Sequence, residues 1–222
     1  MKKFGKKILL SAWLLFCAGI YTACGNAHEL KDLNVLTAVG IQNEGEHYEL
    51  CAQVLKADQA VSEGYGESYR YFMGAGEDFL SAVEDIDAQG AKELTFAHNK
   101  LYLLGGNADS LEALQEMIVN GCYDIRPQSY CVVVRNDLRQ FMTVSDQYGF
   151  DCCYKLLEIL RETEEAPRIN DVLIALRGEA GEARLPIVSA YEGEVRISGW
   201  LRLTAEDFAP PTNPEKTGAM NR

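Results

Sequence analysis

Apolar residues in the first part of the chain follow the two-residue period of strands and then the longer period of a helix. The stretches 35–42 and 48–57 are rich in strand-forming residues and flank the segment "NEGEH", which predicts an antiparallel hairpin. A third strand is expected at 68–74. It is followed by a helix that ends at Gly90 and whose apolar stripe is Phe79, Leu80, Val83 and Ile86.

Strands and helices alternate after this first helix. The pattern predicts a strand over 93–105, a helix over 109–121, a strand over 129–136 and a helix from Asp137 onward. The helix over 109–121 has the clearest signature, because it opens with a capping-box pattern and ends in Asn-Gly. This alternation predicts an α/β (α+β) fold with a mixed β-sheet and flanking helices.

A second, smaller α/β region is expected over 146–208. Its pattern predicts helices within 151–165 and 169–178, and then two strands around the turn "YEGE". The final stretch, 209–222, is rich in Pro, Asn and Gly and is expected to be disordered. The preceding residues 24–145 would form the N-terminal α/β domain.

The first 23 residues have the pattern of a signal peptide. Four lysines precede an apolar run over 8–20, which as a helix would span roughly 20 Å of the ~30 Å hydrocarbon core. The small residues Thr22 and Ala23 precede Cys24 as in a bacterial lipobox, although Tyr21 stands where leucine is usual. We expect cleavage before Cys24, diacylation of its thiol and export to the outer face of the membrane. An uncleaved N-terminal anchor is the alternative.

The charge of the chain becomes more negative once the signal is set aside. Four of the 21 Lys and Arg residues and none of the 33 Asp and Glu residues lie in residues 1–23, so the formal charge changes from −12 to −16. Such an acidic surface disfavours nucleic acid and repels anionic lipid headgroups. Attachment to the membrane would therefore depend on the lipid at Cys24.

The cysteines do not have the spacing of a metal site. Beyond the signal and the expected lipidation site, the chain has five, without a CxxC pair: Cys51, Cys122, Cys131, Cys152 and Cys153. We expect small buried apolar side chains, with a disulfide between some pair as the alternative. No cofactor is expected.

No catalytic motif is evident in the sequence. The chain contains no GxSxG, HExxH or Walker A pattern. His98 is expected to close a strand on the side of Leu94 and Phe96, as a hydrogen-bonded structural residue rather than a base. Trp200 is expected to be a sheet residue packed on a neighbour. The sequence therefore favours a protein that is not an enzyme.

The start of the expected mature chain resembles the Ger(x)C spore-germination lipoproteins, the C subunits of nutrient germinant receptors. The stretch "ELKDLNVLTAVGIQ" over 29–42 matches their acid-leucine segment leading into a strand that ends in Gly-Ile-Asp. Gly40 and Ile41 fit this pattern, whereas Gln42 replaces the aspartate. The tryptophan usual just after the lipidated cysteine is missing.

Three later stretches resemble the same family in the same order. "FAHNKLYLLGG" resembles its Gly-His segment, with His98 matching and Ala97 in place of the glycine. The stretch over 156–188 resembles its second region, and "EVRISGWLRLTAEDF" resembles a strand that begins with a glycine and ends in an aromatic residue. The resemblance covers about residues 17–208. Family members continue into a larger third domain, which is expected to be absent here because the chain stops at Arg222.

The resemblance implies a non-catalytic scaffold or docking subunit in spore germination. Its partners would be the A-type and B-type (permease-like) membrane subunits of a germinant receptor, and its location the outer face of the spore inner membrane, through the lipid on Cys24. An extracytoplasmic solute-binding lipoprotein is the alternative. Such a protein would share the signal and the acidic surface, but it would need two lobes around a deep polar cleft.

Overall fold

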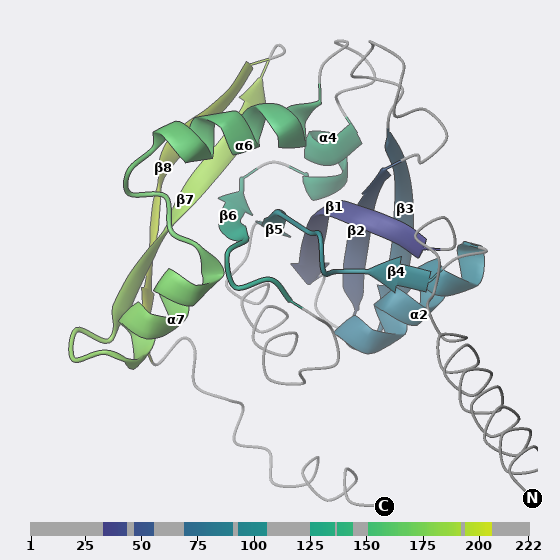
Figure 1. Ribbon diagram of the computed structural model, residues 1–222, viewed down its shortest axis with the longest axis horizontal. Coiled ribbons are helices and arrows are strands. Elements are labelled where there is room, and N and C mark those ends of the chain that lie inside the picture. The colour runs from purple at the N-terminus through teal and green to yellow at the C-terminus, as the bar shows by residue number, and fades with distance from the viewer. Residues whose placement is uncertain are drawn as a thin grey trace, which may run out of the picture. The chain divides into compact units, whose positions relative to one another are not determined.

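A computed structural model gives the fold of most of the chain after residue 32 (Figure 1). It describes residues 33–43, 47–55, 69–90, 93–105, 125–135, 137–143, 151–191 and 194–205. The chain divides into two compact units, Met1–Leu33 and Asn34–Arg222, and apart from the first residue of β1 the elements below belong to the second.

The strands and helices follow one another in a mixed order. The strands are β1 (Leu33–Asn43), β2 (Tyr48–Leu55), β3 (Tyr69–Gly76), β4 (Glu93–Thr95), β5 (Leu101–Gly105), β6 (Tyr130–Val134), β7 (Glu182–Tyr191) and β8 (Glu194–Thr204). The helices are α2 (Phe79–Gln89), α4 (Leu138–Thr143), α6 (Cys152–Glu162) and α7 (Ile169–Arg177). This confirms the predicted α+β class with a mixed sheet.

All the described strands belong to one eight-stranded sheet, in the order β3-β2-β1-β5-β6-β7-β8 with β4 paired to β1. The central pairs β1–β5, β5–β6 and β6–β7 are parallel, and the outer pairs β1–β2, β2–β3 and β7–β8 are antiparallel. The predicted hairpins 35–42/48–57 and 185–208 are therefore confirmed. Because β6 pairs with β7, the sheet continues across residue 145, and the division into two regions there stays a prediction.

Helices cover both faces of the sheet. One buried cluster joins the sheet to α2 and α7, and the other joins it to α4 and α6 (Figure 1). The predicted stripe of α2 is confirmed at Phe79, Val83 and Ile86, which are all buried, whereas Leu80 is only half-buried and Ala82 is the fourth buried residue. The helix stops at Gly90, as predicted. An Asp78 capping box opens this helix, with the Ser81 N–H donating to Asp78 Oδ1 at 2.8 Å.

The single strand predicted over 93–105 is in fact two strands. Residues 97 and 98 form a turn in which the Asn99 N–H donates to the Phe96 carbonyl at 3.0 Å. The first piece, β4, pairs with β1 and the second, β5, lies between β1 and β6. The pattern was misleading because apolar residues continue on both sides of the turn, and periodicity alone does not reveal a short break.

Several predictions lie outside the described residues. These are the signal peptide over 1–23, the lipidation site Cys24, the helix over 109–121, Cys122 and the tail over 209–222.

The described cysteines are buried thiols, as expected. Cys51, Cys131, Cys152 and Cys153 are free and each is at most 1% exposed. Burial raises the pKa of Cys51 and of Cys131 to about 12. These side chains act as small apolar residues of the core rather than as nucleophiles.

A buried polar bridge fixes the start of α6 to the sheet. Asp151 caps the helix by accepting from the Cys153 and Tyr154 N–H groups at 2.8 and 3.2 Å. Both carboxylate oxygens of Asp151 accept from Gln53 Nε2 at 3.0 Å, across 98 positions of sequence. Thr37 Oγ1 in turn donates to Gln53 Oε1 at 2.8 Å. The bridge therefore ties the first turn of α6 to β1 and β2.

The close contact between β3 and α2 gives a first prediction. A methyl group on Gly74 would overlap the Ala82 carbonyl oxygen and the Ile86 side chain, whereas a methyl group on Gly199 would meet only the Ile187 side chain at 3.8 Å. Gly74→Ala should therefore lower the free energy of unfolding by about 1–3 kcal/mol, and the control Gly199→Ala should leave it unchanged or raise it slightly. Urea unfolding measures both. Equal stability of the two variants would contradict this packing.

The bridge gives a second prediction. Burial raises the pKa of Asp151 above its ordinary value of 3.8, against the opposing effect of its hydrogen bonds from Gln53, Tyr154 and Cys153. A carboxyl group whose pKa is raised in the folded state stabilises the fold fully below pH 3.8. This stabilisation is lost as the pH rises through the pKa of the folded state. Asn at this position does not titrate. The stability of the wild type relative to Asp151→Asn should therefore be greater near pH 3.5 than at pH 7.

Urea unfolding at several pH values tests the direction of this pH dependence. The other carboxylates are present in both proteins, so their titration cancels in the stability difference between the wild type and Asp151→Asn. Asp151→Leu is the second variant. It removes the acceptor of two helix N–H groups and leaves Gln53 Nε2 with only the Tyr71 hydroxyl, so it should cost more than Asp151→Asn at every pH, at ~1–3 kcal/mol for each buried group left unpaired. A wild-type advantage over Asp151→Asn that grows with rising pH would refute the raised pKa.

Candidate functional site

A basic cavity lies where the amino ends of β5 and β6 approach the end of α6 and the start of α7. Its volume is about 240 Å³. Four cationic residues line it together with polar and apolar ones: Lys100, Arg126, Arg161 and Arg168, with Asn99, Gln128, Ser129, Tyr130 and Leu157. We call it the basic pocket. Among the described residues that line it there is no Asp or Glu.

The floor of the basic pocket is held by the parallel pairing of β5 and β6. The Tyr130 N–H donates to the Lys100 carbonyl at 2.9 Å, and Ser129 Oγ donates to the Asn99 carbonyl at 2.7 Å. The Ile169 N–H donates to the Ser129 carbonyl at 2.9 Å and so attaches the first turn of α7 to the same edge. Three distant segments therefore meet in a fixed arrangement.

Arg168 is the most constrained cation of the pocket. Its Nη2 donates to the Tyr130 hydroxyl at 2.9 Å, and its guanidinium carbon lies 4.2 Å from the centre of the Tyr130 ring. Its Nη1 donates to the Gln128 carbonyl. The cation–π contact and the two hydrogen bonds hold the guanidinium in one place before any ligand arrives.

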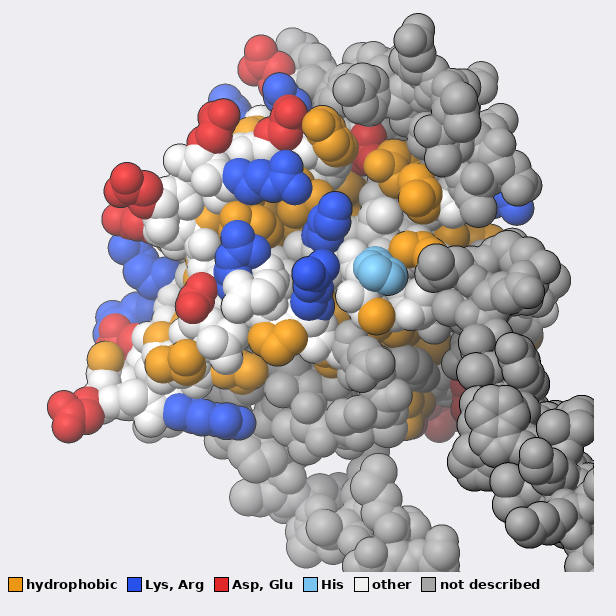
Figure 2. Space-filling view, in the orientation of Figure 1, with side chains coloured by type: hydrophobic (Ala, Val, Ile, Leu, Met, Phe, Trp, Pro, Cys, Tyr) orange, Lys and Arg blue, Asp and Glu red, His pale blue; other side chains and the backbone are white. Residues whose placement is uncertain are grey.

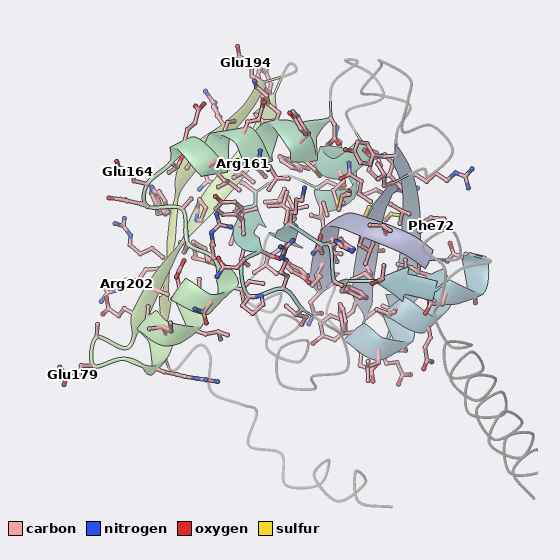
Figure 3. All side chains as sticks on the ribbon, viewed as in Figure 1. Phe72, Arg161, Glu164, Glu179, Glu194 and Arg202 are labelled. Carbon is pink, nitrogen blue, oxygen red and sulfur yellow. The ribbon has the colours of Figure 1, made fainter. Side chains whose placement is uncertain are left out.

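The other three cations are exposed. Arg161 lies one turn after Leu157 on α6 (Figure 3), where its charge also complements the carboxyl end of the helix. In the part of the chain that the structure describes, no carboxylate is paired with Lys100, Arg126 or Arg161. Lys and Arg side chains gather near the middle of the face shown in Figure 2, with acidic side chains mostly toward its edges.

Asn99 and Ser129 are the buried polar residues of the pocket lining. The Asn99 side chain is 0% exposed, and its amide adjoins the Tyr102 hydroxyl without the geometry of a full hydrogen bond. Burial raises the pKa of Tyr102 to about 12, and hydrogen bonding with the Asn99 amide acts in the opposite direction. These two buried groups therefore compensate each other only in part.

The donor groups of the basic pocket suit the binding of an anion. Its described lining contains no His, Cys, Asp or Glu. It offers guanidinium, ammonium and amide donors, which stabilise negative charge. This is the opposite of what the formal charge of −12 suggests for the surface as a whole.

His98 lies beside this pocket in sequence but does not have the predicted setting. It is exposed in the turn between β4 and β5, whereas Leu94 and Phe96 are buried. The prediction that His98 closes a strand on their side is therefore wrong, because the strand ends before the turn. Its immediate neighbour Asn99 is the buried residue. The role of His98 stays a prediction.

Other candidate sites have weaker features. A second cavity, of about 220 Å³, is lined by residues of both charges that include Glu49, Asp137 and Arg139. Trp200 is a sheet residue of β8 with the Arg184 guanidinium 5.7 Å from its ring centre, as expected of a residue packed on a neighbour. Within the described ranges, no three His, Cys, Asp or Glu side chains are grouped closely enough to hold a metal ion.

The sequence did not reveal the basic pocket. Its cations come from four separate segments, and each alone looks like an ordinary exposed charge. The only local signal is "IRPQSY" over 125–130, where a proline turn brings Arg126 and Gln128 in front of a buried strand.

A comparison with protein families supplies independent information. Residues 26–190 match the model of a family described as spore germination protein N-terminal domain. No curated protein and no solved structure matches the chain. In the described part of the chain, no helix is long and apolar enough to span a bilayer.

Proposed function

Because the chain belongs to the family of the spore germination protein N-terminal domain, we propose that it is a lipid-anchored, C-subunit-like component of a nutrient germinant receptor. Family membership itself gives a role in spore germination. The proposal adds that the protein acts by docking to the A-type and B-type (permease-like) membrane subunits and not by catalysis.

The main observation in support of the proposal is the position of Cys24 in the sequence. The matched family region begins at residue 26, two positions after this cysteine. Small residues and an apolar run precede it, as in a lipoprotein signal. A single acyl chain gives only marginal membrane binding, whereas diacylation supplies the two chains that stable anchoring needs.

A lipid on Cys24 would keep the folded body close to its partners. Strand β1 begins at Leu33, nine residues later, and that length of extended chain reaches at most about 32 Å. Confinement to the membrane plane raises the effective concentration of the two partners, so a weak contact is enough for docking.

The alternative, an extracytoplasmic solute-binding lipoprotein, calls for two lobes around a deep cleft. The described strands form one sheet with helices on both faces, and the two cavities described above measure about 240 and 220 Å³. This arrangement supports a docking body over a two-lobed binder.

Lipidation gives the third prediction. Cys24→Ala should abolish palmitate labelling of the chain and leave the precursor unprocessed, because the thiol is the acyl acceptor. Cys17→Ala is the matched control and should keep both labelling and processing, since that cysteine lies within the expected signal. Labelling followed by gel mobility measures both outcomes. Continued labelling of Cys24→Ala would exclude this cysteine as the anchor.

Docking can be measured with the same two variants. A tagged chain solubilised from spore membranes should co-purify with the A-type and B-type subunits in the wild type and in Cys17→Ala, and much less in Cys24→Ala. Normal lipidation without any co-purification would reject docking while leaving the anchor intact.

A further inference from the structure

We propose that the basic pocket is a binding site for a phosphoryl group, carried either by a small soluble molecule or by a lipid headgroup. The inference is independent of the lipid at Cys24 and of receptor docking. It rests on the four cations, the fixed guanidinium of Arg168 and the size of the cavity.

The concentration of positive charge in the pocket is the first argument. Lys100, Arg126, Arg161 and Arg168 line one cavity of about 240 Å³ in a chain with 33 acidic and 21 basic residues. Like charges gathered in this way repel one another, and no described carboxylate of the lining compensates them. A bound anion removes this repulsion. Acidic side chains elsewhere oppose it little, because salt screens exposed charges beyond about 8 Å at physiological ionic strength.

The donors suit a phosphoryl group better than a single carboxylate. A phosphate ester carries a charge of about −1.5 to −2 and three strong acceptor oxygens. Arg168 is already held by Tyr130 and Gln128, so little side-chain entropy is lost when its remaining N–H groups bind.

The size of the cavity limits the ligand. Pockets for drug-sized ligands measure roughly 300–1,000 Å³, whereas this one is about 240 Å³. The cavity therefore takes the phosphoryl group and a few further atoms, and the rest of a larger ligand would extend into solvent. A soluble phosphate ester and a phospholipid headgroup both meet this description.

Isothermal titration calorimetry on the full chain in detergent tests the site. The probes are inorganic phosphate, dihexanoyl phosphatidate and, for comparison, acetate, all at one ionic strength. The pocket variant is Lys100→Gln with Arg126→Gln, two exposed positions whose side chains hold no element in place. The control is the exposed Arg196→Gln on β8, outside the pocket.

The wild type should bind phosphate saturably, and the pocket variant should bind it at least about tenfold more weakly, as expected for charge-assisted hydrogen bonds. Arg196→Gln should bind like the wild type. Equal affinity for phosphate and phosphatidate would assign the site to soluble phosphoryl compounds. At least tenfold tighter binding of phosphatidate, lost in the pocket variant, would assign it to a lipid headgroup.

Three results would overturn the proposal. They are no saturable binding of either phosphoryl probe, binding that the pocket variant retains in full, and acetate binding as tight as that of phosphate. Unchanged thermal unfolding of the pocket variant without ligand confirms that any loss of binding comes from the lost charges and not from misfolding.

Discussion

Burial of strand β5 on both faces is the constraint on which the rest of the structure depends. All five of its residues are buried. Leu101 and Leu103 belong to the core under α4 and α6, whereas Tyr102 and Leu104 belong to the core under α2 and α7. The parallel pairs of the central sheet need crossover connections, and these supply helices for both faces: α2 lies between β1 and β5, and α4, α6 and α7 lie between β6 and β7. The same pairing brings the amino ends of β5 and β6 to one edge, where the basic pocket forms.

The parts of the fold that could be predicted are those set by short-range patterns. The β1–β2 hairpin and the stripe of α2 each follow from residues within one element and its turn. The break between β4 and β5 could not be predicted, since buried Phe96 continues the apolar pattern up to the turn. Nor does the sequence show that β1 pairs with β5, because that contact depends on which faces the distant helices cover.

The candidate site was harder to predict than the fold, for a reason that its residues make plain. Lys100 and Arg168 are far apart in sequence, and only the sheet edge and the turn before α7 bring them to one cavity. The formal charge of the chain suggested that anions would be repelled. The sequence also drew attention to exposed His98, although its neighbour Asn99 is the buried polar residue. Net charge is a property of the whole surface, and a site is set by the few charges that the fold gathers.

The buried polar groups show how one fold uses the same kind of side chain in two ways. Gln53 and Asp151 satisfy each other's hydrogen bonds, and the pair fixes α6 on the sheet. Asn99 is as deeply buried, and its amide adjoins the Tyr102 hydroxyl without the geometry of a full hydrogen bond. Burial removes water from the polar groups in both places, so the difference lies in what compensates that loss. For Asp151 and Gln53, well-formed hydrogen bonds within the protein compensate it. For Asn99 the compensation is only partial, at a cost of about 1–3 kcal/mol for a buried group that is not fully paired.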